Sequence, residues 1–165
     1  MGDRTGGRPR VRDATADGWP AGLPFWHETV AAGETYARDR DTDEQAARAL
    51  WTAPDPRVFA VEADPAPEAG PTAGDRAGAA GAIVAPASAR PHHGGPARGV
   101  AHAGFMAGPA HAGRGIGRLL AGHVLDEARR DGHTATVFPA VVETDPAPRL
   151  RGSLGFTIPG TVPEA

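Results

Sequence analysis

The chain has 165 residues, which is the size of one domain rather than two. Ala, Gly and Pro account for 74 residues, and Leu, Ile, Val and Phe for only 26, so we expect a folded domain with a small core and long irregular stretches. The net charge of −3 argues against a nucleic-acid partner, and the absence of Lys and Cys excludes a phosphate-loop or Schiff-base lysine, a cysteine nucleophile, thiolate metal sites and disulfides.

Residues 1–10 are polar and predict a disordered leader, followed by a single domain over residues 11–165. The leader lacks the apolar stretch of a signal peptide, and the chain has no apolar run long enough to cross a membrane. We therefore expect a cytoplasmic protein that has no membrane partner.

The first half of the domain predicts two helices after a short strand at residues 11–14. The first helix fits residues 19–36, where large apolar side chains recur at helical spacing. The second fits residues 43–51, and Thr42 is the predicted cap. Both helices should pack an apolar side on a sheet.

The middle of the chain predicts little regular structure. Residues 57–61 alternate as a strand does, and residues 62–80 are an Ala/Pro/Gly-rich segment that predicts a flexible insertion. A short strand is expected at residues 81–85 and a loop over residues 86–99. Within that loop, adjacent His92 and His93 would point apart, so we predict no metal site.

The last third of the chain predicts an alternation of strands and helices. The expected elements are a strand at residues 100–107, a Gly-rich turn at 111–115, a helix at 116–130, a strand at 134–142, a short helix at 146–154 and the start of a last strand at 156–158.

The Gly-rich turn carries the chemical signal. Residues 112–117 read A-G-R-G-I-G, and they lie between a strand and a helix. Glycines let backbone amides approach a ligand, and the start of a helix adds partial positive charge, so the turn suits a pyrophosphate. A dinucleotide fingerprint would need Gly where Arg118 stands, and a P-loop would need Lys.

The turn resembles the coenzyme A loop Q/R-x-x-G-x-G/A of the Gcn5-related N-acetyltransferases, the GNAT family. Residues 100–109 resemble that family's fourth strand with its trailing proline, residues 134–142 its fifth strand, and Leu154, Gly155 and Phe156 its closing motif. The resemblance covers most of residues 11–162 and is nearest to the small-amine, proline-analogue type of acetyltransferase.

The resemblance implies an α/β (α+β) fold. Its central sheet would be mixed and mostly antiparallel, flanked by helices, with strands four and five splayed apart. The sequence ends at Ala165 without a segment for the family's seventh strand, so we expect that strand to be missing. The implied function is an enzyme that transfers an acetyl group from acetyl-CoA, as co-substrate, to the amine of a small or amino-acid-like acceptor. A homodimer is compatible with the resemblance.

The resemblance also assigns site residues. His102 and Glu143 are candidates for the catalytic base, an imidazole being well suited to deprotonate an amine near neutral pH. By family resemblance, the substrate would meet Trp26, Glu34 and Tyr36. Coenzyme A would meet the fourth strand, the turn and a position after the fifth strand: Phe105, Met106, Ala107, Ala112, Gly113, Arg114, Gly115, Ile116, Gly117, Arg118 and Asp145.

Some positions differ from the family's pattern. Ala112 replaces the usual Gln or Arg, whereas His102, Pro139 and Asp145 stand where close relatives usually carry Asn. Arg151 stands where the family often has Tyr, and an Arg is not a proton donor near pH 7. These differences leave two alternatives open: a catalytically impaired GNAT remnant that binds coenzyme A, and a partly folded chain that needs a partner to complete its sheet.

Overall fold

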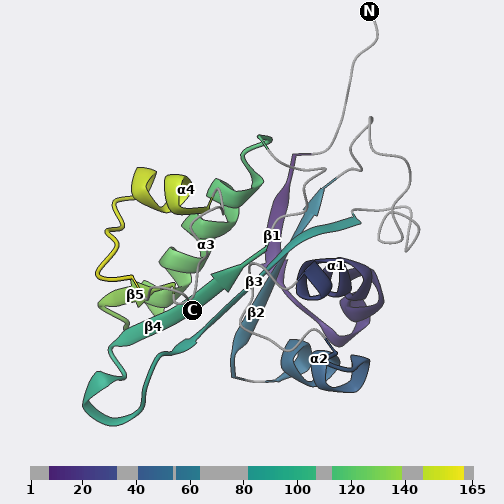
Figure 1. The fold of residues 1–165 in the computed structure, drawn as a ribbon, viewed down its shortest axis with the longest axis horizontal. Coiled ribbons are helices and arrows are strands. Elements are labelled where there is room, and N and C mark those ends of the chain that lie inside the picture. The colour runs from purple at the N-terminus through teal and green to yellow at the C-terminus, as the bar shows by residue number, and fades with distance from the viewer. Residues whose placement is uncertain are drawn as a thin grey trace, which may run out of the picture.

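A five-stranded sheet forms the centre of the computed structural model, which describes residues 8–32, 41–53, 55–63, 82–106, 113–138 and 147–161 (Figure 1). Its strands follow one another in chain order: β1 (Arg10–Asp13), β2 (Arg57–Ala63), β3 (Ala82–Pro91), β4 (Val100–Phe105) and β5 (Ala135–Val137). All neighbours pair antiparallel except β4 and β5, which are parallel. The expected mixed, mostly antiparallel sheet is therefore confirmed.

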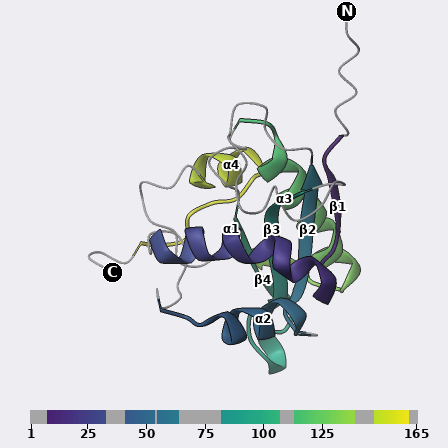
Figure 2. The ribbon, with the colours of Figure 1, turned by 90° about the vertical axis from the view of Figure 1, so that its right-hand side faces the viewer.

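Helices cover both faces of this sheet. α1 (Trp19–Ala32) and α2 (Glu44–Thr52) lie on one face, and α3 (Ile116–Arg130) lies on the other with α4 (Ala147–Ser153) beside its first turn (Figure 1). The view turned by 90° shows α1 and α2 in front of the strands (Figure 2). Short 3-10 turns at Ala16–Gly18 and Gly95–Ala97 complete the described elements. In the described ranges, no helix is both long and apolar enough to cross a membrane.

Two apolar clusters hold the layers together. Along β2, Phe59 and Val61 belong to the cluster under α3, whereas Ala60 between them belongs to the cluster under α1 and α2. This division follows from the alternation of side chains along a strand. The α3 cluster contains the fully buried Ile116, Leu120 and Val124, and the other contains Trp19, Trp26 and Trp51.

The helix predictions are confirmed in large part. α3 spans the predicted residues 116–130, and its i, i+4 apolar row is buried. α1 begins at Trp19 as predicted, although residues 33–36 lie outside the described residues. The predicted cap of α2 is wrong, because Asp43 rather than Thr42 is the N-cap and its Oδ1 accepts a hydrogen bond from the Ala46 N–H at 2.7 Å.

β3 is longer than predicted. The expected loop begins six residues too early, since the strand continues through residues 86–91 and pairs with β2 and β4 on its two sides. Ala87 and Ala89 are buried in the α3 cluster, so small side chains supply the inward face there. This part of β3 is a strand because it pairs with β2 and β4, and not because its side chains favour strands.

Other boundaries also differ. Arg10, predicted in the leader, pairs with Glu62 at the β1–β2 ladder, and β2 continues to Ala63 into the predicted insertion. No strand forms at residues 156–158 among the described residues. The Phe156 N–H instead donates to the Arg151 carbonyl at the end of α4, at 3.1 Å, which turns the chain away from a sheet ladder.

Candidate active site

Among the described residues, β5 pairs with only the first half of β4. Residues Val100–His102 pair with Ala135–Val137, but β4 continues to Phe105, beyond the end of the described β5 strand. Hydrogen-bonding groups of successive strand residues point to opposite edges. The Met106 N–H donates to the Pro86 carbonyl of β3 at 3.0 Å, so the backbone groups of Phe105 are directed toward β5. Ala107, predicted to bind coenzyme A with these residues, lies outside the described residues.

The Gly-rich turn leads into α3. Gly113 and Gly115 have φ angles of 73° and 78°, and a Cβ built at either would meet no heavy atom of the described residues within 4 Å. Only glycine adopts such angles without strain, and both positions leave the main chain exposed. Ala112, at the start of the turn, lies outside the described residues.

Among the described residues, no side chain caps the first turn of α3. Gly115 is its N-cap in the left-handed conformation and has no side chain that could accept from the helix, unlike Asp43 in front of α2. The first intrahelical bond that reaches back to the cap is Leu119 N–H to Gly115 carbonyl, at 3.0 Å. The earlier N–H groups, including those of Ile116 and Gly117, have no carbonyl partner within the helix. Together with the helix dipole, they suit a phosphate group.

α4 packs directly on this turn of α3. A Cβ at Gly117 would lie 3.0 Å from Leu150 Cδ2, so glycine is what allows the two helices to approach. Arg118 donates from Nη2 to Ser153 Oγ at 2.6 Å, and it therefore joins α3 to α4. Arg114 is exposed beside the turn. The predicted contacts of these two arginines with coenzyme A stay predictions.

The candidate bases are placed only in part. His102 is half-buried on β4, at the last residue that pairs with β5, and its ring centre is 5.5 Å from that of His92 at the end of the β3–β4 hairpin. It is three residues, or about 10 Å of strand, from Phe105. Glu143, Asp145 and Pro139 lie outside the described residues, so the roles of His102 and Glu143 as bases stay predictions.

Of the predicted acceptor residues, Trp26 lies on the face of the sheet that α1 and α2 cover. Trp26 is 7% exposed and lines a cavity of about 70 Å³ together with Met106 and side chains of α2, β2 and β3. Glu34 and Tyr36 are outside the described residues. The structure thus brings Trp26 and Met106 to one cavity, and the substrate role of Trp26 stays a prediction.

One residue near the site was noted in the sequence only as a departure from the family pattern. Arg151 of α4 lies over two aromatic rings, with its Cζ atom 4.5 Å from the Phe138 ring centre and 5.4 Å from the Phe105 ring centre. Its place shortly before Leu154, Gly155 and Phe156 was the available signal. The contact joins α4 with the ends of β4 and β5, and no local sequence pattern predicts a contact between segments so far apart in the chain.

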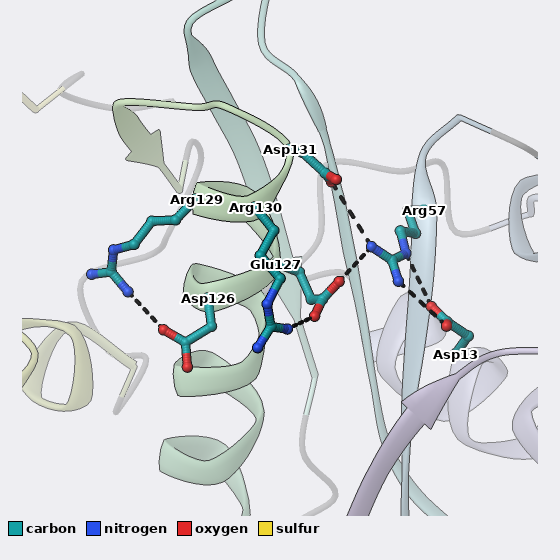
Figure 3. Close-up of polar contacts among 7 residues, drawn as sticks. All are labelled: Asp13, Arg57, Asp126, Glu127, Arg129, Arg130 and Asp131. Carbon is teal, nitrogen blue, oxygen red and sulfur yellow. Dashed lines mark hydrogen bonds and ion pairs between the residues drawn. The ribbon is translucent and has the colours of Figure 1, made fainter.

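The far end of α3 is anchored by charge (Figure 3). Glu127, whose side chain is 10% exposed, accepts from Arg57 Nη1 of β2 at 2.5 Å and from Arg130 one turn along the helix. Arg57 also bonds Asp13 of β1, at 3.0 Å from its Nε. Burial acts to raise the pKa of Glu127, but the hydrogen bonds from Arg57 and Arg130 outweigh it, so that pKa lies below its ordinary value. The network fixes the C-terminal end of α3 to β2, and through Arg57 to β1.

Comparison with known proteins identifies the class to which this fold and turn belong. The sequence profile of the acetyltransferase (GNAT) family matches residues 25–156, which is most of the chain. A search of curated proteins found no match. The chain belongs to the GNAT family, and it is an acetyltransferase enzyme of that class.

Solved structures agree with this assignment. A GCN5-related N-acetyltransferase from Kribbella flavida is 41% identical, with a TM-score of 0.80 over 95% of this chain and 87% of that one. yncA of Salmonella typhimurium, solved with its cofactor acetyl-CoA, shares the fold at 23% identity and a TM-score of 0.73, over 93% of this chain and 82% of that one. A phosphinothricin acetyltransferase from Sinorhizobium meliloti, in complex with acetyl-CoA, shares it at 19% identity and a TM-score of 0.69, over 92% and 76%.

Proposed function

We propose that this chain transfers the acetyl group of acetyl-CoA to the amine of a small-molecule or amino-acid-like acceptor. The observation that carries the proposal is the turn at Gly113 and Gly115, whose open glycines precede the first turn of α3. The end of β4, with which no described residue of β5 pairs, completes the site. The phosphinothricin acetyltransferase fold of the Sinorhizobium meliloti protein supports a small acceptor.

Each part of the donor then has a partner in the chain. The pyrophosphate accepts from the N–H groups at the start of α3, where the helix dipole favours negative charge. The pantetheine extends along the β4 edge beside Phe105, where a backbone N–H can stabilise the oxygen of the attacked carbonyl. A neutral amine attacks that carbonyl, and His102 or Glu143 receives its proton.

The donor site is tested by calorimetry with acetyl-CoA and a matched pair of variants of the full chain. Gly115→Glu places a carboxylate in front of the α3 N–H groups, and we expect binding to weaken by more than about tenfold, or about 1.4 kcal/mol. Gly132→Glu is the control, because Gly132 has a similar φ of 84° and similarly open space among the described residues but follows the other end of α3.

The two variants separate charge at the turn from backbone strain. Binding lost in Gly115→Glu and kept in Gly132→Glu supports the proposed site. Equal loss in both variants, or full binding by Gly115→Glu, would show that the phosphates do not bind at this turn.

The reaction is tested by the release of coenzyme A thiol with a panel of amines that includes free amino acids, simple primary amines and a peptide with N-terminal Ala. We expect release that depends on a small amine. Acetyl-CoA binding without turnover of any amine would overturn the proposed activity. A strong preference for the peptide would overturn the proposed acceptor class.

A further inference from the structure

Aromatic side chains gather where β4 and the described part of β5 end. Phe105 ends β4, and Phe138 directly follows β5. Their ring centres are 5.3 Å apart with the ring planes at 78°, and the Phe138 and Phe156 ring centres are 5.1 Å apart. Phe105 and Phe138 also pack on the apolar cluster under α3. The described residues at these two strand ends thus form a surface of low polarity.

α4 places a positive charge on this surface. Arg151 is half-buried, and its guanidinium lies over the faces of Phe138 and Phe105. A guanidinium stays protonated at every pH at which the protein is folded, and a ring face holds a cation without removing its charge. Charges in such poorly solvated surroundings act more strongly than charges in water.

We propose that Arg151 stabilises the thiolate of coenzyme A as it leaves the acetyl group. The inference rests on the proposed function, which runs the pantetheine along β4 beside Phe105 and so brings its sulfur near the aromatic rings over which Arg151 lies. Thiols have pKa values near 8.5 in water, and these fall when an arginine is close. Arg151 would then be a catalytic residue of the acetyl transfer.

The step balances without a proton from Arg151. The nitrogen lone pair forms a bond to the carbonyl carbon, the carbon–sulfur bond breaks, and its electron pair stays on sulfur. The proton of the amine goes to the base. The thiolate is held by the guanidinium and takes its proton from water on release, so the reaction needs no side-chain acid at the sulfur.

Two other arginines lie near Arg151, and Arg149 provides the control. Arg149 is exposed on the same helix, two residues earlier. Arg118 reaches α4 from α3 and donates to Ser153. Arg149→Gln therefore removes an equal charge from α4 while it leaves the aromatic surface occupied.

The test is the ionisation of bound coenzyme A, followed by the ultraviolet absorbance of its thiolate as pH is raised, with the full chain in excess. For the wild type and Arg149→Gln, we expect the bound thiol to ionise at least about one pH unit below free coenzyme A. Arg151→Gln should return it to the free value, and Arg151→Lys should keep part of the shift. The kcat of Arg151→Gln should fall about tenfold, the equivalent of one pKa unit, with little change in acetyl-CoA affinity.

The outcomes are separable from those of the proposed function. No binding of acetyl-CoA by the wild type overturns both. If the wild type binds acetyl-CoA and turns over an amine, two results overturn only the role of Arg151. One is a bound thiol that ionises as free coenzyme A does, and the other is a thiol that ionises at the same pH in the wild type and in Arg151→Gln. If Arg151→Gln fails to fold, the wild-type titration and Arg151→Lys decide, and a wild-type thiol without a shift refutes the proposal.

Discussion

Replacing Glu127 by Gln should destabilise the domain by about 2 kcal/mol. The side chain is 10% exposed and is the shared acceptor of Arg57 and Arg130, which come from β2 and from α3 itself. Gln has the same shape, but it offers one acceptor oxygen and turns an N–H group toward a guanidinium. A hydrogen bond to a charged group contributes about 1.5–3 kcal/mol. Because Arg57 and Arg130 are 40% and 68% exposed and can regain water, the lower half of that range applies.

The assay is thermal unfolding by circular dichroism, with Asp126→Asn as the matched control. Asp126 is the preceding residue and pairs with Arg129 at 2.8 Å on the opposite side of α3, where both side chains are more than 60% exposed (Figure 3). For a chain of this size, about 2 kcal/mol lowers Tm by about 4–8 °C. The exposed pair contributes at most about 0.5 kcal/mol, so its loss should move Tm by about 2 °C or less.

The same pair tests the pH dependence. The pKa of Glu127 is lowered below its ordinary value of 4.5 in the folded state, so its stabilising effect is complete above that pH and is lost as pH falls through the folded pKa. The Tm difference between wild type and Glu127→Gln should stay constant from about pH 7 to pH 5 and narrow below about pH 4.5. Equal Tm values for Glu127→Gln and Asp126→Asn at neutral pH would refute the reasoning.

Three further pairs of substitutions test the packing of the helices and the cap of α2. Gly22→Ala places a Cβ 2.9 Å from Trp51 Cη2 and should lower the free energy of unfolding in urea by about 1–3 kcal/mol. Gly122→Ala, with open space among the described residues, should be neutral or stabilising by up to about 1 kcal/mol. The reverse order would contradict the α1–α2 contact. Leu120→Ala should lower the free energy of unfolding by about 3 kcal/mol, and Leu119→Ala by less than about 1 kcal/mol, because Leu119 is 41% exposed in the wild type. Similar urea midpoints for the two variants would show that α3 does not pack as described. Asp43→Ala should lower stability by about 1 kcal/mol and Asp43→Asn should restore most of it, unless the cap of α2 is not formed in solution.

The parts of the fold that the sequence predicts well are those with a local physical signal. α3 has an i, i+4 apolar row bounded by Gly115 and Gly132, and its predicted limits agree with the structure. The second half of β3 has no such signal, since its inward residues are Ala87 and Ala89. That half is a strand because β2 and β4 pair with it, which is a property of the tertiary structure.

The candidate site divides in the same way. The glycine turn was predictable, because its chemistry depends on consecutive residues and on the helix that follows. The position of Arg151 was not, because Phe105 and Phe138 come from other segments and meet it only in the folded chain. The charge of Glu127 would ordinarily indicate a solvated helix face, and its burial becomes tolerable only when Arg57 arrives from β2.

The backbone character of the α3 turn has a consequence for the unusual composition of this protein. A site built from main-chain N–H groups depends on the path of the chain and hardly on which side chains surround it. A composition rich in Ala, Gly and Pro and without Lys is therefore compatible with the proposed donor site. The proposed acceptor site would rely on side chains, so substitutions should redirect acceptor choice more easily than donor binding.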